Sequence, residues 1–298
     1  MYRILKSKDG EDMYAEILNS DKSSYSKIYL NKGASLQELV LGNNHIIKNM
    51  SPMTYEETYA SSILFPFANR VKDGKYRFEN KTYQLEINET DLNNALHGLV
   101  YNKTFEIINE EVTDTSATVK LAYHETKKLN GFPYSYSVYL DYTLKDFDLE
   151  IKVSVKNTDT KTFPFTLGWH PYFVSDNLGE SLLMFDSNKK LKWDNRNITT
   201  GILETEVPKV LKIQNQEFND CFLLNSSVVH FQTPKYLLIL MSSESDGFLQ
   251  LYTPPKKNTI AIEPTTGVSD SLNNKIGLKT LKPNNDYEVE WNVTVVNN

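Results

Sequence analysis

Cysteine and long apolar runs are scarce in this chain of 298 residues, and an excess of positive charge is absent, because 38 acidic residues outnumber 32 Lys and Arg. The one cysteine, Cys221, excludes an internal disulfide framework and a multi-cysteine metal site. The formal net charge of −6 argues against a nucleic-acid partner, because a polyanion requires a basic face. No apolar run approaches the roughly 20 residues that span a bilayer, and the N-terminus lacks the apolar core of a signal peptide. We therefore expect a cytoplasmic protein with neither nucleic-acid nor membrane partners.

Motifs for metals, phosphates and nucleotides are also missing. None of the five histidines stands in a His-x-His, His-x-x-x-His or Glu-x-x-His spacing, so no built-in transition-metal site is predicted. A P-loop, a dinucleotide fingerprint and a serine nucleophile elbow are absent. The sequence thus predicts neither a metal nor a cofactor.

Strand periodicity, by contrast, recurs along almost the whole chain. Apolar residues alternate with polar ones over 135–144 and again over 149–156, with a turn at 145–148 between them. This pattern predicts an antiparallel hairpin with one wet face. The segment 288–295 alternates in the same way. Eighteen tyrosines and fourteen phenylalanines suit pleated, half-buried surfaces.

Strand-like segments follow one another from about residue 13 to 296 without intervening helices or a long linker. A length of 298 residues is enough for one large domain with an ample core. We therefore expect an all-β protein, a large antiparallel β-sandwich that forms a single domain over 1–298.

Three titratable residues lie where apolar segments meet turns, namely His97 before Gly98, His170 after Trp169, and Glu263 before Pro264. A carboxylate or imidazole in such a position is a candidate for proton transfer. The aromatic residues around His170 are typical of a site that holds the apolar face of a sugar ring. The context of His97 alone leaves a structural and a functional role equally open, and Gly98 would let the backbone approach a ligand closely.

Two further polar residues are candidates for the site, but each also has a simpler, purely structural interpretation. Arg70 follows an aromatic-Pro-aromatic run, where it would either extend to solvent or direct its donors at hydroxyl oxygens. Asp220 follows Asn219, and an Asn-Asp pair is commonly just a turn.

Several short motifs, taken together, resemble the aldose 1-epimerase (mutarotase) family, and the similarity covers roughly residues 30 to 296. In chain order they are PFANRV at 66–71, LHG at 96–98, GFP at 131–133, GWHPYF at 168–173, IEPTT at 262–266 and GLKTLKP at 277–283. The resemblance implies a galactose mutarotase-like supersandwich, in agreement with the strand periodicity.

The resemblance also implies roles for individual residues. Glu263 would be the general base and His170 the general acid of a metal-free exchange of α and β anomers. His97, Arg70 and the adjacent Asn69 would bind the sugar, and Asp220 stands where the family often has a substrate-binding Asp. In the productive state we expect an ionised Glu263 and a protonated His170. The segment FPY at 132–134 differs from the Tyr-Pro-Gly form of galactose mutarotases, so galactose need not be the preferred sugar.

Other functions remain open at this point. They are a hexose-phosphate mutarotase of the same superfamily, a carbohydrate-binding protein without catalysis, and a glycosidase or lyase that pairs Glu263 with Asp220. A phosphate would require a cationic pocket, to which Lys72 or Lys103 would have to contribute alongside Arg70. The partner we expect is a small sugar, and the oligomeric state is a monomer or a homodimer.

Overall fold

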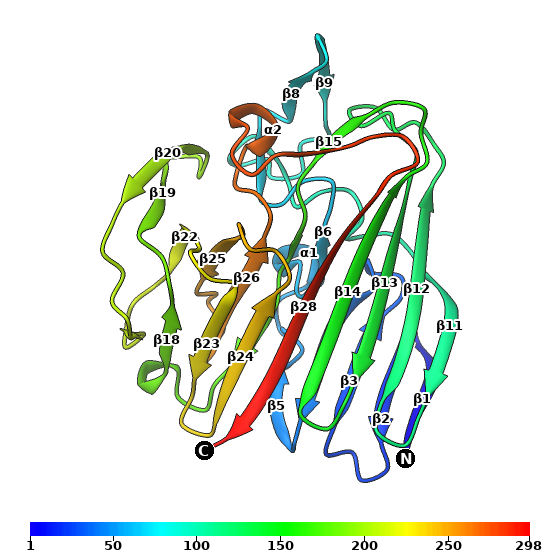
Figure 1. Cartoon of the computed structure of the whole chain (residues 1–298), viewed down its shortest axis with the longest axis vertical. Coiled ribbons are helices and arrows are strands. Elements are labelled where there is room, and N and C mark those ends of the chain that lie inside the picture. The colour runs from blue at the N-terminus through cyan, green and yellow to red at the C-terminus, as the bar shows by residue number, and fades with distance from the viewer.

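The computed structural model describes all of residues 1–298 and is built almost entirely from antiparallel strands (Figure 1). The larger sheet has 13 strands. Its order is β1 (Tyr2–Asp9), β2 (Asp12–Asn19), β3 (Tyr25–Tyr29), β4 (Ser35–Leu41), β5 (Asn44–Ile47), β17 (Tyr172–Val174), β26 (Thr259–Thr265), β25 (Phe248–Tyr252), β22 (Asn219–Leu223), β19 (Lys189–Trp193) and β20 (Thr199–Glu204), and β16 (Gly168–Trp169) joins β26 to β6 (Ile63–Leu64).

The second sheet has nine strands and packs against the first. Its order is β11 (Glu106–Val112), β12 (Ala117–Glu125), β13 (Tyr136–Leu144), β14 (Asp148–Asn157), β28 (Asp286–Asn297), β24 (Tyr236–Ser242), β23 (Val228–Gln232), β18 (Leu182–Phe185) and β21 (Leu211–Lys212).

Three short two-stranded ribbons lie outside these sheets, and helices are few and short. The ribbons are β7 (Arg70–Lys72) with β10 (Asn94–Leu96), β8 (Lys75–Phe78) with β9 (Lys81–Gln84), and β15 (Phe163–Phe165) with β27 (Lys279–Leu281). The helices are α1 (Tyr55–Thr58), α2 (Ser271–Asn274) and a 3₁₀ turn, Leu178–Glu180. None of them has the length and apolar composition that crossing a bilayer would require.

The predicted antiparallel sandwich is confirmed, and so is the amphipathic pattern of its strands. Tyr136, Val138, Leu140, Tyr142 and Leu144 of β13 are all fully buried. Strands β13 and β14 form the expected hairpin, closed by a hydrogen bond from the Lys145 N–H to the Asp148 carbonyl. The alternation therefore identified the inward face of the sheet correctly.

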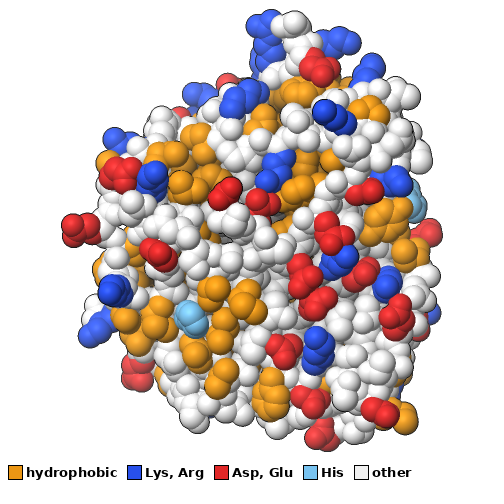
Figure 2. All heavy atoms as spheres, in the orientation of Figure 1, with side chains coloured by type: hydrophobic (Ala, Val, Ile, Leu, Met, Phe, Trp, Pro, Cys, Tyr) orange, Lys and Arg blue, Asp and Glu red, His pale blue; other side chains and the backbone are white.

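On the outer face of the nine-stranded sheet, acidic and basic side chains are interspersed over β14 and β28, whereas apolar side chains gather over β23 and β24 (Figure 2). Charged pairs connect neighbouring strands there: Lys152 Nζ lies 2.8 Å from Glu288 Oε2, and Lys120 Nζ lies 3.8 Å from Asp141 Oδ2. Such exposed pairs stabilise the fold only slightly.

One apolar core of 59 buried residues lies between the two sheets. The indole rings of Trp169, on β16, and Trp291, on β28, stack across the interface with centroids 6.2 Å apart. Trp169 directly precedes His170, so this contact anchors the start of the His170 segment in the core. Gly98 has a different role from the expected approach to a ligand: its φ is +81°, and a Cβ there would lie 2.3 Å from the Phe65 carbonyl oxygen.

A matched pair of leucine substitutions tests this packing. Leu140→Ala should lower the free energy of unfolding by about 2–5 kcal/mol, because it leaves a cavity in the buried face of β13. Leu203→Ala, on the edge strand β20, should change it by less than about 0.5 kcal/mol, because that side chain is 44% exposed. Urea titrations followed by tryptophan fluorescence would measure both, and equal losses would contradict the assignment of the core.

Candidate functional site

The floor of the candidate site is formed by central strands of the 13-stranded sheet. Strand β26 pairs with β16 through Gly168 opposite Thr265, and with β17 through Tyr172 opposite Ala261. The same antiparallel register places His170, between β16 and β17, opposite Glu263. On the other side of β26, Gln250 is the cross-strand partner of Glu263. Side chains opposite each other across strands lie on the same face of a sheet, so His170, Glu263 and Gln250 form one row.

The wall of the site comes from the β7–β10 ribbon and its flanking turns. Arg70 pairs with Leu96 in this ribbon, and the His97 N–H donates to the Asn69 carbonyl at 2.9 Å. Asn69 and His97 both have left-handed backbones, with φ of 60° and 61°. Non-glycine residues with positive φ are uncommon and cluster at functional sites. The ribbon thereby directs Asn69, Arg70 and His97 into the same cavity as the floor residues.

The resulting cavity has a volume of about 330 Å³, within the range of small-ligand sites. His170 Nε2 lies 3.5 Å from Glu263 Oε1, and both side chains are buried. The His97 and His170 rings have centroids 5.0 Å apart, and the His170 ring stacks on Tyr172 with centroids 4.9 Å apart. The acid and base candidates are therefore adjacent, and aromatic rings flank them.

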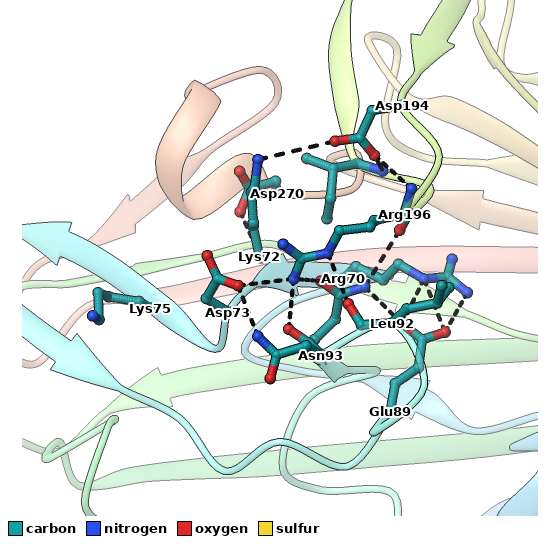
Figure 3. Close-up of polar contacts among 12 residues, drawn as sticks. Arg70, Lys72, Asp73, Lys75, Glu89, Leu92, Asn93, Asp194, Arg196 and Asp270 are labelled. Carbon is teal, nitrogen blue, oxygen red and sulfur yellow. Dashed lines mark hydrogen bonds and ion pairs between the residues drawn. The ribbon is translucent and has the colours of Figure 1, made fainter.

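Arg70 is held by a carboxylate that the sequence reasoning did not identify. Its Nε donates to Glu89 Oε2 at 2.9 Å, its Nη2 donates to Glu89 Oε1 at 2.7 Å, and its Nη1 donates to Asn69 Oδ1 at 3.1 Å (Figure 3). This two-point pairing fixes the guanidinium plane. It also places a negative charge against Arg70.

Burial favours the neutral forms of three titratable groups in the cavity. Burial lowers the pKa of His170 to about 4, with a smaller contribution from the Arg70 charge. Burial also holds the pKa of His97 well below its ordinary value, and the His170 and Arg70 charges act in the same direction. Burial raises the pKa of Glu263 well above its ordinary value, although Arg70 opposes the shift. The protein surroundings alone thus disfavour the ionised Glu263 and protonated His170 that we expect in the productive state.

Several polar atoms of this cavity have no partner within the protein. Nδ1 of His97, Nδ1 of His170 and Oε1 of Gln250 are buried and make no hydrogen bond. Buried polar groups are normally paired, so these atoms are suited to bind a ligand rich in hydroxyl groups. The structure contains no cluster of three His, Cys, Asp or Glu side chains that could hold a metal ion.

Five of the six predicted site residues line the cavity, and Asp220 does not. They are Asn69, Arg70, His97, His170 and Glu263. Asp220 pairs instead with Lys190, with Oδ1 2.5 Å from Nζ. The reason is the strand alternation: in β22, Asn219 pairs with Tyr252 and reaches the cavity, and the next residue faces the other side of the sheet. The placement of Asp220 in the site was therefore wrong by one residue.

The sequence reasoning also missed other residues that line the cavity, among them Tyr59, Glu89, Asn197, Asn219 and Gln250. Strand alternation would have found Gln250, because it is the cross-strand partner of Glu263, but only once the pairing of β25 with β26 is known. Asn197 and Glu89 lie in turns and loops, for which periodicity gives no signal.

The raised pKa of Glu263 has a consequence for stability that can be tested. Because the folded state binds a proton on Glu263 more tightly than the unfolded state, the wild type loses stability as the pH rises from 4.5 through the folded pKa. Glu263→Gln keeps the shape and cannot ionise, so it should be more stable than the wild type at pH 8, with a difference that shrinks toward pH 4.5. Chemical denaturation at both pH values measures this. A difference that does not change with pH would contradict it.

The lowered pKa of His170 makes the stability change with pH in the opposite direction, and it serves as an internal check. Its folded pKa of about 4 lies below the ordinary 6.5, so its contribution to stability is lost as the pH falls from 6.5 to 4. The Glu263→Gln variant should keep this acid-side loss.

Comparison with known proteins places the chain in a family. The aldose 1-epimerase family model matches residues 17–294. The uncharacterized protein YihR of Escherichia coli K12 is 24% identical over 284 residues, covering 90% of each chain. An aldose 1-epimerase of Lactobacillus helveticus is 34% identical over 94 residues, which cover 30% of this chain and 70% of that protein.

Solved structures share the fold. A galactose mutarotase-like protein of Clostridium acetobutylicum superposes with a TM-score of 0.89 at 20% identity, covering 99% of both chains. The galactose 1-epimerase of Lactobacillus acidophilus superposes with a TM-score of 0.82 at 18% identity, covering 100% of this chain and 99% of that one. The sandwich, the matching family model and these relatives together show that this chain belongs to the aldose 1-epimerase family.

Proposed function

We propose that the protein is an aldose 1-epimerase that interconverts the α and β anomers of a free aldohexose, with Glu263 as base and His170 as acid. The observation that carries the proposal is the placement of the two side chains, adjacent and buried in one cavity, with 3.5 Å between His170 Nε2 and Glu263 Oε1. The two oxygens that must exchange protons, the anomeric hydroxyl and the ring oxygen, are bonded to the same carbon. A neighbouring acid and base can therefore act on both.

The reaction needs only proton transfers. Glu263 takes the proton of the anomeric hydroxyl while His170 gives a proton to the ring oxygen, and the bond between C1 and the ring oxygen breaks to give the open-chain aldehyde. The carbonyl rotates, and the ring closes on its other face as the two residues return the protons. No covalent intermediate forms.

The burial of the pair favours this exchange. Before ring opening the pair is a carboxylate and an imidazolium, and after ring opening it is a carboxylic acid and a neutral imidazole. The pair carries one proton in both states. Because burial lowers the pKa of His170 and raises the pKa of Glu263, it stabilises the state that accompanies the open-chain sugar. Sugar hydroxyls and Arg70 would support the carboxylate in the closed-ring complex.

A free sugar fits the charges of the cavity better than a sugar phosphate. Arg70 is the one Lys or Arg residue in the lining, which also holds His97 and His170, and Glu89 already pairs with Arg70. Lys103 lies in a different cavity, and Lys72 lies 4.0 Å from Asp194. A phosphate would therefore find acidic residues and amides but no unpaired cation.

A glycosidase reaction is less well supported, because it requires two carboxyl groups that flank one bond. Asp220 is outside the cavity and paired with Lys190. Glu89 is bound by Arg70, and Glu57 caps α1 through Thr54. None of these carboxylates is available as a partner for Glu263.

Substitution of either catalytic residue tests the assignment. Glu263→Gln and His170→Asn should each reduce turnover by about 10²–10⁴-fold, the contribution of one positioned acid or base. Sugar binding should survive, because both variants keep hydrogen-bonding groups of similar shape. Exchange NMR of the anomeric protons, with binding measured by calorimetry, separates the two effects. Near-normal exchange in either variant would show that the roles are assigned wrongly, and binding without exchange in the wild type would favour a non-catalytic carbohydrate-binding protein.

The choice between free and phosphorylated sugars has its own test. The wild type should accelerate the anomer exchange of glucose or another free aldohexose with a higher kcat/KM than that of glucose 6-phosphate, because the cavity offers the phosphate no unpaired cation. The same exchange NMR on both sugars measures the ratio. A preference for the phosphate would favour the hexose-phosphate mutarotase.

A further inference from the structure

A turn between β19 and β20, residues 194–198, lies against the cavity, and neither the proposed chemistry nor the family motifs assign it a role. Asn197 in this turn is one of the residues that line the cavity. Its backbone is left-handed, with φ of 58°, a conformation that asparagine tolerates better than most residues. Its carbonyl accepts a hydrogen bond from the Ser269 hydroxyl at 2.8 Å, whereas its side-chain amide makes no hydrogen bond within the protein. The amide is therefore available to a ligand.

The turn is closed from within by Asp194. Oδ1 of Asp194 accepts the N–H groups of Arg196, at 2.8 Å, and Ile198, at 3.0 Å. The Asn197 N–H donates to the Asp194 carbonyl at 3.0 Å. These bonds define the backbone of the turn but do not attach it to the wall of the cavity.

Most of the attachment is made by the side chain of Arg196 (Figure 3). Two weaker contacts add to it: Lys72 Nζ lies 4.0 Å from Asp194 Oδ2, and Asn94 Nδ2 donates to the Arg196 carbonyl at 3.3 Å. Arg196 Nε donates to the Leu92 carbonyl at 2.8 Å, and its Nη2 lies 2.7 Å from the Asn93 carbonyl and 2.9 Å from Asp73 Oδ1. All three partners lie in the connection between β7 and β10: Asp73 directly follows β7, and Leu92 and Asn93 directly precede β10. The Arg196 side chain thus makes three of the contacts that join the turn to the ribbon of Arg70.

Arg196 also connects to Arg70 through a buried amide. Its Nη2 lies 3.0 Å from Asn94 Oδ1, and Asn94 Nδ2 donates to Glu89 Oε2 at 2.8 Å. Because the guanidinium of Arg196 has only donors, it requires the oxygen of the Asn94 amide to point toward it. The amide nitrogen then donates to the Glu89 carboxylate and, at 3.3 Å, to the Arg196 carbonyl. The Arg196 contact therefore fixes the orientation in which Asn94 supports the pairing of Glu89 with Arg70.

We propose that Asn197 is a sugar-binding residue and that Arg196 is the positioning residue that holds it, and the Glu89–Arg70 pair, against the sugar. The ligand class is a neutral polyol, because an amide both donates to and accepts from hydroxyl groups. The inference rests on the proposed function for the identity of the sugar but concerns binding, not proton transfer.

Two variants test it, each with a matched control. Asn197→Gly removes the amide without opposing the left-handed backbone, and Asn195→Gly makes the same change at an exposed residue of the same turn that does not line the cavity. Arg196→Ala removes the positioning side chain, and Arg77→Ala removes the same charge from the exposed β8–β9 ribbon, where its one hydrogen bond is to Asn80 at 3.4 Å.

The readouts are the dissociation constants of D-glucose and D-galactose by calorimetry and the KM and kcat of anomer exchange. Asn197→Gly and Arg196→Ala should each raise the dissociation constant and KM by about five- to tenfold, the effect of one or two lost hydrogen bonds. Their kcat should change by less than about threefold, because the acid–base pair is untouched. The double variant should resemble the more affected single variant, because the two residues act as a unit. Both controls should match the wild type.

Several results would overturn the inference. One is wild-type sugar affinity in Asn197→Gly. Another is wild-type affinity in Arg196→Ala, and a third is an equal loss in Asn195→Gly, which would show that only the stiffness of the turn matters. Anomer exchange with unchanged affinity in Arg196→Ala would reject this inference and keep the proposed function. If the wild type exchanges no anomers but the variants bind sugar more weakly, the proposed function is rejected and this inference is kept.

Discussion

The site depends on the register of one strand. Strand β26 is paired on both sides, with β16 and β17 on one edge and β25 on the other. A shift of one residue in either pairing would turn the facing side chains to the opposite side of the sheet. His170 or Gln250 would then lie beneath the sheet, away from Glu263. The stacking of Trp169 on Trp291 holds this register from the core side.

Burial of Glu263 and His170, the catalytic candidates, shifts their pKa values and also costs folding free energy. A carboxyl group without a cationic partner in a buried row disfavours its ionised form, and Arg70 cannot compensate fully because Glu89 already pairs with it. The apolar core of 59 buried residues between the two sheets offsets this cost in folding free energy. Because burial favours the neutral forms of both groups, the pair suits the proposed reaction, in which protons pass in both directions between two anomers.

The strands and most of the floor of the site could be predicted from the sequence. The residues that reach the cavity from turns and loops could not. Alternation alone identified the buried face of β13, because each residue there meets the same core. His170 and Glu263 were recognisable because their motifs resemble those of the family, although the structure places Glu263 inside β26 and not at the end of a strand. Asp220 was misassigned because the choice between it and Asn219 depends on where β22 begins, and a one-residue uncertainty reverses the face. Glu89 and Asn197 gave no signal, because their positions follow from hydrogen bonds between segments far apart in the chain.

The separation of the two kinds of element in the cavity has a consequence for how such a protein can change. The proposed proton-transfer groups are held by the sheet, with Glu263 in β26 and His170 between the paired strands β16 and β17, so an insertion there would displace one from the other. The cavity residues in turns and loops, such as Asn197, belong to short connections whose lengths are not fixed by the pairing of strands. Natural or laboratory evolution could therefore exchange the 194–198 connection for another of different length to admit a different monosaccharide, while the reaction mechanism is inherited unchanged.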